Sequence, residues 1–285
     1  MKQLLILSGK GGTGKTTIAS AMIALSQTHI YADCDVDAPN LHLTASNIGM
    51  AKRKPFIGMD KSIIDQSICS HCGQCMEVCR FDAIKLIDGD YHVDEFACEG
   101  CGVCQTVCPT KAITMSESVA GELMLFDEVD YFSTAKLKMG SGTSGKLVSE
   151  VKQGLKEYKG SDDLTIIDGS PGIGCPVIAS ISGVTMVLVV AEPSLSGFSD
   201  MERILATAKH FATKVAVCVN KADQLPAITD KIKEFCQKED VPFVGVIPYD
   251  SDVPKLLNEG KNIVASPCKA RDYVTEIYHK TMALV

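Results

Sequence analysis

Eight of the thirteen cysteines in this 285-residue chain stand in two short runs. Both runs have the spacing CxxCxxCxxxC, in which three closely spaced thiols are followed by a fourth. Their members are Cys69, Cys72, Cys75 and Cys79, then Cys98, Cys101, Cys104 and Cys108. In a reducing compartment, an odd cysteine total and such tight clustering favour metal binding over disulfide formation. The spacing therefore predicts metal centres built from thiolates.

The two runs belong to a duplicated segment, because CSHCGQCMEVCRFDAI is followed by the similar CEGCGVCQTVCPTKAI. This pattern resembles the bacterial ferredoxins with two [4Fe-4S] clusters, in which the fourth cysteine of each run ligates the other cluster. The resemblance implies one cluster on Cys69, Cys72, Cys75 and Cys108, and a second on Cys98, Cys101, Cys104 and Cys79. Pro109 follows Cys108 as in that family, whereas Arg80 follows Cys79 and departs from its pattern.

Two alternatives to a redox pair of clusters stay open. Zinc also binds four thiolates, although its sites usually combine CxxC pairs rather than three cysteines and a distant fourth. Iron–sulfur clusters can also serve a purely structural role. Cys175 is a further candidate ligand, because it lies seven residues after Asp168, the offset of a cluster-binding cysteine in the nitrogenase iron protein; a structural role is the preferred interpretation.

A glycine-rich segment directly follows the first apolar run of the chain. Residues 9–16 read GKGGTGKT and satisfy GxxxxGK[ST], the loop whose amides surround phosphate oxygens at a helix N-terminus. Lys15 is predicted to reach the β and γ phosphates, and Thr16 to ligate Mg²⁺. The residues predicted to bind the nucleotide here are Gly11, Gly12, Thr13, Gly14, Lys15, Thr16 and Thr17.

Lys10 is a second lysine that the basic motif does not require. With it, residues 10–16 resemble the KGGxGKT loop of the deviant Walker A ATPases, the class of MinD, ParA and the nitrogenase iron protein. The resemblance implies that Lys10 reaches the phosphates of a neighbouring subunit and neutralises charge during phosphoryl transfer. It therefore implies a homodimer that forms on ATP binding.

Acidic residues follow two further predicted strands. Asp33, Asp35 and Asn40 match the DxDxxxxNL segment of the same class, which implies that Asp35 positions the attacking water. Asp33 and Asp37 are weaker candidates, because acids at strand ends often serve as caps. Asp168 ends the run LTIID, resembles a Walker B acid and is predicted to hold Mg²⁺.

The base specificity has two interpretations. Residues 220–223 read NKAD, the NKxD form that recognises guanine in GTPases. The resemblance to the deviant class instead implies adenine, contacted by Asn220, Pro248 and Asp250. We therefore expect ATP and ADP as the nucleotides.

Outside the cysteine region, short β-branched runs alternate with helix-like segments, a pattern typical of βαβ units around a buried parallel sheet. The expected strands are Gln3–Ser8, Ile30–Asp33, Leu164–Asp168, Thr185–Ala191, Lys214–Val219 and Phe243–Ile247. The expected helices are Lys15–Ser26, Gly145–Lys156, Asp200–Ala212, Ala227–Lys238 and Arg271–Met282. The predicted class is α/β, a parallel-sheet P-loop NTPase fold of the SIMIBI class with an inserted ferredoxin-like α+β module. Its domains are expected at 1–61 with 116–285, and at 62–115.

Composition and charge restrict the partners and the compartment. The formal net charge of −7 and the absence of a basic run argue against nucleic-acid binding. No long apolar run or signal-peptide pattern is found, so we expect a cytoplasmic protein, and the C-terminal segment has too few basic residues to favour membrane association.

The leading functional hypothesis is an ATPase that gates electron transfer to an unidentified redox or metalloprotein partner. One alternative is an iron–sulfur assembly or metalloprotein maturation factor, which would transfer its clusters. Another is a redox-sensing positioning ATPase similar to MinD. The motifs do not choose among these roles, because one fold serves many functions.

Overall fold

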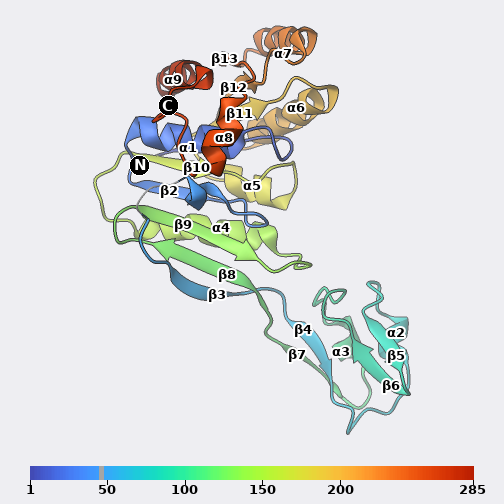
Figure 1. The fold of residues 1–285 in the computed structure, drawn as a ribbon. Helices are drawn as coiled ribbons and strands as arrows, with labels where there is room; N and C mark the ends of the chain where they lie inside the picture. The colour runs from blue at the N-terminus through green and yellow to red at the C-terminus, as the bar shows by residue number, and fades with distance from the viewer. Residues whose placement is uncertain (45–47) are drawn as a thin grey trace. The chain divides into compact units, whose positions relative to one another are not determined.

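The computed structural model describes residues 1–44 and 48–285, and its chain divides into two compact units (Figure 1). The larger unit comprises residues 1–53, 123–136 and 144–285. The smaller unit comprises residues 54–122 and 137–143, so it includes the range 62–115 predicted as an insertion and extends beyond it on both sides. Residues 45–47, which belong to the predicted range 1–61, lie outside the described residues.

A nine-stranded sheet has the order β13-β12-β11-β1-β10-β2-β9-β8-β3. Every pair from β13 through β9 is parallel. The strands are β1 (Lys2–Leu7), β2 (Ile30–Asp33), β3 (Lys52–Ile57), β8 (Val119–Phe126), β9 (Tyr131–Leu137), β10 (Leu164–Asp168), β11 (Met186–Ala191), β12 (Lys214–Asn220) and β13 (Phe243–Ile247).

The central strands are apolar on both faces because helices cover both faces of the sheet. In the larger unit α1 and α9 lie on one face, and α4, α5 and α6 lie on the other with α7 beside α6 (Figure 1). The helices are α1 (Lys15–Ser26), α4 (Ser144–Gly154), α5 (Cys175–Ile181), α6 (Leu195–His210), α7 (Pro226–Lys238), α8 (Asp252–Asn258) and α9 (Lys269–Met282), with short 3-10 turns η1 (Leu41–Leu43) and η2 (Leu155–Glu157).

Alternate residues of each central strand contribute to different cores. Leu4 and Ile6 of β1 pack with Ile18 and Met22 of α1 and with Val274 of α9. Because the strands are parallel, their carboxyl ends meet at one edge of the sheet, where the loops after β1, β2, β10, β12 and β13 are gathered. That edge is therefore the place at which side chains from distant parts of the sequence come together.

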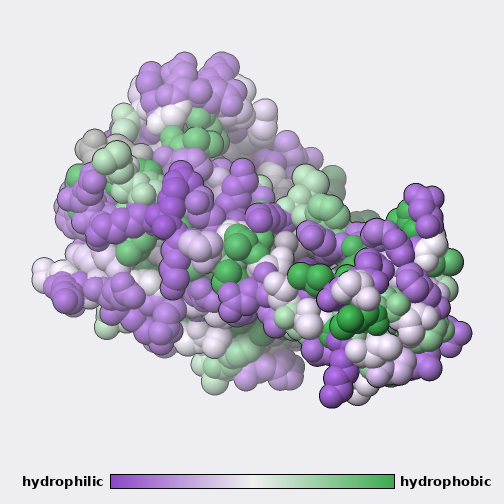
Figure 2. All heavy atoms as spheres, turned by 90° about the horizontal axis from the view of Figure 1, so that it is seen from below, coloured by the Kyte–Doolittle hydropathy of each residue, from purple (hydrophilic) through white to green (hydrophobic). Residues whose placement is uncertain are grey.

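The smaller unit contains two antiparallel strand pairs and two short helices. β4 (Lys61–Ile64) pairs with β7 (Ile113–Ser116), and β5 (Ile84–Ile87) pairs with β6 (Asp90–Val93). The helices are α2 (Gln74–Glu77) and α3 (Val103–Val107), and each begins after a glycine in the left-handed region. Its small core buries Cys75, Cys104, Ile84, Tyr91 and Ile113, and half of the ten residues of this cluster are cysteines. Apolar side chains are exposed among polar ones on this unit (Figure 2).

The predicted elements differ from the observed ones mainly at their ends and at the far side of the sheet. The helix predicted from Asp200 begins at Leu195, because Ser194 accepts a hydrogen bond from the Gly197 amide at 3.0 Å and caps it. Strands β3, β8 and β9 were not predicted, since β3 (KRKPFI) is mostly exposed and lacks the apolar run of a central strand. Among the described residues, no helix has the length and apolarity needed to cross a membrane.

Candidate nucleotide site and cysteine cavities

The glycine loop joins β1 to α1 at the carboxyl edge of the sheet. Gly12 and Gly14 have φ of 78° and 93°, in the left-handed region that glycine adopts without strain. A Cβ atom on Gly14 would lie 2.3 Å from Nδ2 of Asn220, so the position also requires glycine for space. The loop therefore presents its backbone toward the space in front of α1.

Lys15 and Thr16, the first residues of α1, both contact Asp168 at the end of β10. Lys15 Nζ lies 2.6 Å from Asp168 Oδ1, and Thr16 Oγ1 donates to Oδ2 at 2.6 Å. Burial alone would lower the pKa of Lys15, but the charge and hydrogen bond of Asp168 outweigh this and raise it. The lysine is therefore cationic, and Thr16 and Asp168 together offer two oxygens of the kind that Mg²⁺ prefers.

Asp33 organises the loop after β2. Its side chain is fully buried, and its carboxylate accepts hydrogen bonds from the amides of Asp35, Asn40 and Leu41 at 2.9, 2.9 and 3.0 Å. Burial, with the neighbouring Asp168 charge, raises the pKa of Asp33. Asp33 therefore holds in place the loop that carries Asp35, a role that the sequence interpretation underestimated.

Asp35 lies beside the glycine loop. It lines a cavity of about 370 Å³ together with Lys10, Lys15 and Thr16. Burial raises the pKa of Asp35, and the nearby Lys15 charge acts against this rise. The structure thus brings together at one cavity the three residues predicted to be catalytic, which are Lys10, Lys15 and Asp35.

Lys10 is paired within its own chain. Its Nζ lies 2.8 Å from Glu192 Oε2 and 3.3 Å from Ser194 Oγ, in the loop after β11. Lys221 Nζ lies 3.4 Å from the other oxygen of Glu192 and donates to Gly12 O at 2.8 Å. Partial burial would raise the pKa of Glu192, but these two lysines outweigh it and lower that pKa. Glu192 therefore holds the lysine that was predicted to act on a neighbouring subunit.

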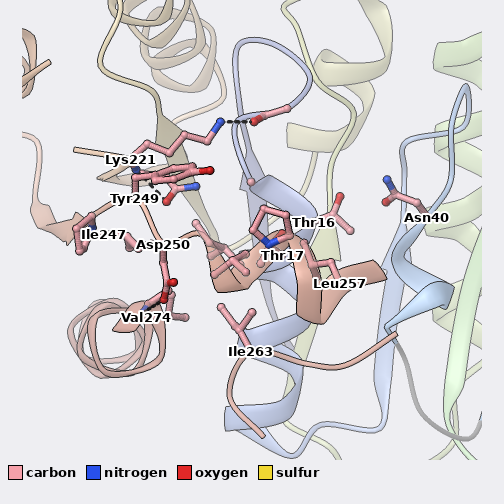
Figure 3. Close-up of a pocket in the computed structure, with 18 residues that line it drawn as sticks. Thr16, Thr17, Asn40, Lys221, Ile247, Tyr249, Asp250, Leu257, Ile263 and Val274 are labelled. Carbon is pink, nitrogen blue, oxygen red and sulfur yellow. Dashed lines mark hydrogen bonds between the residues drawn. The ribbon is translucent and has the colours of Figure 1, made fainter. Parts of the chain in front are cut away.

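A second cavity, of about 380 Å³, opens beside α1 and the loop after β13 (Figure 3). Thr16 and Asn40 lie on one side of it, and Tyr249 and Lys221 lie on the other, where Lys221 Nζ donates to Gly12 O of the glycine loop. Its remaining wall is apolar and comes from the C-terminal part of the chain, including Ile247, Pro248, Val253, Leu257, Ile263 and Val274. A flat heterocycle would be enclosed there by aliphatic side chains.

Polar residues at this cavity are engaged with the backbone. Asn220 Nδ2 donates to Thr13 O at 2.7 Å, and Asp223 Oδ1 accepts from the Tyr249 amide at 2.6 Å. Asp250 accepts from the amides of Asp252 and Ala270, both at 3.0 Å. Asn220 and Asp250 line the cavity, whereas Asp223 is not among its lining residues. The NKxD aspartate therefore orders a loop here.

The eight clustered cysteines surround two small cavities in the smaller unit. Cys108 is followed by Pro109 and Cys79 by Arg80, and each of these cysteines lines a cavity with three cysteines of the other run. One cavity is lined by Cys69, Cys72, Cys75 and Cys108. The other is lined by Cys98, Cys101, Cys104 and Cys79. Each cavity thus collects three thiols of one run and the fourth of the other.

Hydrogen bonds to sulfur distinguish these thiols. The pKa of Cys98 is lowered, because partial burial, which would raise it, is outweighed by hydrogen bonds from Ser62 and Gly100 and by the Lys61 charge. The Ala112 amide donates to Cys108 Sγ at 3.2 Å. Among the described residues, no group of three or more Cys, His, Asp or Glu side chains is placed to hold a single metal ion.

The other five cysteines lie outside these cavities. Cys34, Cys218 and Cys236 are buried in the larger unit, and Cys268 is half-buried. Cys175 is exposed at the first position of α5. A Cβ atom on Gly145 would lie 3.2 Å from Cys175 Cβ, and the structural role of Cys175 stays a prediction.

A glycine loop between a parallel strand and a helix, with Lys15, Thr16 and Asp168 around it, defines the P-loop class of nucleotide-binding proteins. The chain belongs to the CobQ/CobB/MinD/ParA nucleotide binding domain family, whose model matches residues 4–263. Members of this family include MinD and ParA ATPases, so the family predicted from Lys10–Thr16 is confirmed.

Individual relatives extend over nearly the whole chain. An uncharacterised protein of Methanocaldococcus jannaschii is 33% identical over 284 residues, which cover 98% of this chain and 95% of that protein. The septum site-determining protein MinD of Bacillus subtilis is 22% identical over 273 residues, or 93% of this chain and 82% of that protein. The structure of MinD from Pyrococcus horikoshii complexed with Mg-ADP has a TM-score of 0.57 and 19% identity, and the match covers 99% of this chain and 96% of that one. The last likeness shows a shared fold and confirms the predicted α/β class with a mostly parallel sheet.

Proposed function

We propose that this chain is a cytoplasmic ATPase that carries two [4Fe-4S] clusters and uses an ATP-dependent dimer to control electron transfer to a protein partner. Residues 1–61 and 116–285 form its ATPase domain in this proposal, and residues 62–115 its cluster domain. The observation that carries it is the pair of cavities, each lined by four cysteines from both runs. Membership of an ATPase family supports the nucleotide half.

The nucleotide half assigns roles to residues at the larger unit's two cavities. Lys15 binds the phosphates, and Thr16 and Asp168 hold Mg²⁺ once a nucleotide displaces their mutual hydrogen bond. Asp35 orients the attacking water, and Lys10 leaves Glu192 to reach the partner subunit's nucleotide. The apolar cavity beside Pro248 takes the base. Asp223 accepts a hydrogen bond from the Tyr249 amide and does not line this cavity, so it does not recognise guanine.

The cluster half rests on the donor set. Four thiols at each cavity match the ligand number of a [4Fe-4S] cluster, and their mixed origin matches the crossed ligation of two-cluster ferredoxins. Such clusters supply one-electron chemistry when bound. Zinc is the competing occupant, because it also accepts four thiolates. Metal analysis of the purified protein separates the two.

Exposed apolar side chains border one of the two cysteine cavities and offer a surface to a partner. Phe81 and Val103 line the cavity of Cys79, Cys98, Cys101 and Cys104, and they are 44% and 45% exposed. Electron transfer between proteins uses small contact areas close to the redox centre. Exposed apolar side chains at a cluster therefore suit a transient redox partner.

The first experiment tests the clusters. The full chain, purified and reconstituted without oxygen, is expected to bind about eight irons and to show the absorbance and reduced-state EPR of [4Fe-4S] clusters. Cys79→Ala and Cys108→Ala should each lose about half of the iron, from different cavities, because each removes one of four ligands. Stoichiometric zinc without iron, or no metal, would reject this half of the proposal.

The second experiment tests the coupling. Binding of Mg-ATP or a non-hydrolysable analogue should form a dimer and change the EPR spectrum or the reduction potential of at least one cluster. Lys15→Ala, which removes the phosphate-binding cation, is expected to abolish the change while keeping its iron. Identical spectra and potentials with and without nucleotide would contradict gating. Transfer of iron to an apo-ferredoxin during turnover would favour the assembly role instead.

Similarity to septum site-determining proteins favours a positioning role as the second candidate. In this chain the apolar face of α9, which includes Ala270, Val274 and Ile277, packs in the core against the sheet and α1. The helix would have to leave that core before it could bind a membrane surface. ATP-dependent pelleting with anionic vesicles would support this candidate, and its absence would favour the electron-transfer role.

A further inference from the structure

Ser62 in β4 contacts two of the clustered cysteines. Its side chain is 6% exposed, and its Oγ lies 3.1 Å from Cys104 Sγ and 3.7 Å from Cys98 Sγ. The preceding residue, Lys61, donates a hydrogen bond from Nζ to the backbone oxygen of Cys98. The Ser62 hydroxyl therefore lies in the cavity wall, and the Lys61 cation is bound to the backbone of one of its cysteines; Glu99 also lines this cavity.

The direction of the Ser62 hydrogen bond follows from the chemistry of a ligating cysteine. A cysteine that binds metal has lost its proton, so the hydroxyl must be the donor to Cys104 Sγ. The competing acceptors are Met115 Sδ, which lies farther away at 3.6 Å and is neutral, and Cys98 Sγ at 3.7 Å, which belongs to the same ligand set. Hydrogen bonds to charged acceptors are the stronger ones, so the thiolate takes the proton of Ser62.

The duplicated half of the unit lacks this pair. The sequence offset that relates Cys69 to Cys98 relates Lys61 to Asp90 and Ser62 to Tyr91. Tyr91 lines the other cavity, and Asp90 has a half-exposed carboxylate 3.8 Å from His71. At equivalent positions, a cation and a short hydroxyl donor thus stand beside one cavity, which Glu99 also lines, and an acid and an aromatic ring stand beside the other.

The cavity of Cys69, Cys72, Cys75 and Cys108 has a weaker hydroxyl contact. Thr110 Oγ1 lies 3.7 Å from Cys108 Sγ, and Thr110 is exposed. Water competes with such an exposed donor, whereas the buried Ser62 hydroxyl acts in a region of lower dielectric. The Ala112 amide also donates to Cys108 Sγ at 3.2 Å. The two cavities therefore differ in their buried hydroxyl and in the charged residue at the equivalent position, not in whether a sulfur accepts a hydrogen bond.

Hydrogen bonds to sulfur and nearby positive charge stabilise the reduced, more negative form of an iron–sulfur cluster and raise its reduction potential. We propose that Lys61 and Ser62 make the cluster held by Cys79, Cys98, Cys101 and Cys104 the one with the higher potential. This inference rests on the proposed function, because it requires both clusters. An electron from a low-potential one-electron donor would then settle at the cavity bordered by the exposed Phe81 and Val103.

The test is a potentiometric EPR titration of the reconstituted full chain and three variants, with dithionite as the reductant. The unaltered chain is expected to show two separate one-electron steps. Ser62→Ala should lower only the higher step, so that at a fixed potential the oxidised-to-reduced ratio of that cluster rises about threefold to tenfold, or about 30 to 60 mV. Ser62→Thr keeps the hydroxyl and should restore the potential.

Thr110→Val is the matched control, because it removes the exposed hydroxyl at the other cavity. It should shift only the lower step, and by a smaller amount. A shift of the lower step by Ser62→Ala, or no shift with the iron content intact, overturns the inference. Loss of iron from the unaltered chain would instead reject the proposed clusters, and iron counting on every variant keeps the two failures distinct.

Discussion

At the scale of single residues, the glycine loop is surrounded by charges that are already paired. Lys15 is bound to Asp168, and Lys10 is bound to Glu192. The first pair is almost completely buried, whereas the side chains of the second are 38% and 19% exposed. Partly exposed ion pairs contribute at most about 1 kcal/mol, so nucleotide phosphates can displace Lys10 from Glu192 at little cost.

Lys10→Ala tests the lysine's predicted action on a neighbouring subunit. The change should alter the affinity for ATP by less than about threefold, because Lys15 and the loop amides remain. It should lower kcat about a thousandfold, which is the lower end of the range for catalytic cations supplied in trans. Equilibrium binding, steady-state hydrolysis and sedimentation with a non-hydrolysable analogue are the measurements. An unchanged kcat would show that Lys10 is only a loop lysine.

Glu192→Gln tests the hold that Glu192 has on Lys10. Loss of the ion pair should raise basal ATP hydrolysis about two- to fivefold, a gain that corresponds to less than about 1 kcal/mol. Glu234→Gln, an exposed change on α7, is the matched control and should leave the rate unchanged. Equal rates for both variants would mean that the pair does not restrain Lys10.

At the scale of elements, carboxylates anchor the loops that build the cavity. Asp33 holds the loop after β2, Asp223 holds the Tyr249 amide, and Asp250 connects the starts of α8 and α9. Each carboxylate accepts hydrogen bonds from backbone amides that need an acceptor in these loops. The loops therefore have defined positions before a nucleotide binds.

Asp223→Ala separates ATP from GTP recognition. Because Asp223 orders the Tyr249 loop, the change should weaken ATP and GTP binding by a similar factor, about five- to twentyfold, for one lost charge-assisted hydrogen bond. Isothermal titration with both nucleotides is the measurement. A selective loss of GTP affinity would instead favour the guanine-binding interpretation of the NKAD segment.

Asp250→Ala should destabilise the larger unit by about 1 to 3 kcal/mol, because two backbone amides lose their acceptor. Urea unfolding monitored by circular dichroism measures this change. Asp230→Ala, at a carboxylate that is 65% exposed, is the control and should cost less than about 0.5 kcal/mol. Similar midpoints for the two variants would contradict the anchoring role.

At the scale of the whole molecule, the two units differ in what stabilises them. The larger unit buries a continuous aliphatic core on both faces of its sheet. Half of the residues in the small core cluster of the smaller unit are cysteines. If the proposed clusters are bound, a core of so few aliphatic residues should depend on them for stability.

Removal of iron with a chelator is therefore expected to loosen the smaller unit alone. Hydrogen exchange followed by mass spectrometry should show lost protection in β4 to β7 and retained protection in β1, β10 and β11. ATP binding should persist in the iron-free chain. Equal protection of β4 to β7 with and without iron would show that this unit folds independently of metal.

The sequence by itself determined the family, the βαβ rhythm and the glycine loop, because these depend on local spacing and periodicity. It predicted the central strands to within a residue or two, but it missed β3, which is polar and mostly exposed, and β8 and β9, whose apolar residues are interrupted by Gly, Glu, Ser, Thr or Lys. The eight cysteine ligands and their crossed sets remain a prediction that the two cavities support. The phosphate-binding roles of adjacent loop residues likewise rest on local spacing and stay a prediction.

Only the tertiary structure decided how distant side chains pair. The contacts of Lys10 with Glu192, of Asp223 with the Tyr249 amide and of Ser62 with Cys104 join residues far apart in the chain. No local motif encodes them, because they depend on which loops the parallel sheet brings to one edge and on which strands pair in the smaller unit. Spacing determines which residues can bind a phosphate or a metal, and packing determines which charges and hydroxyls surround them.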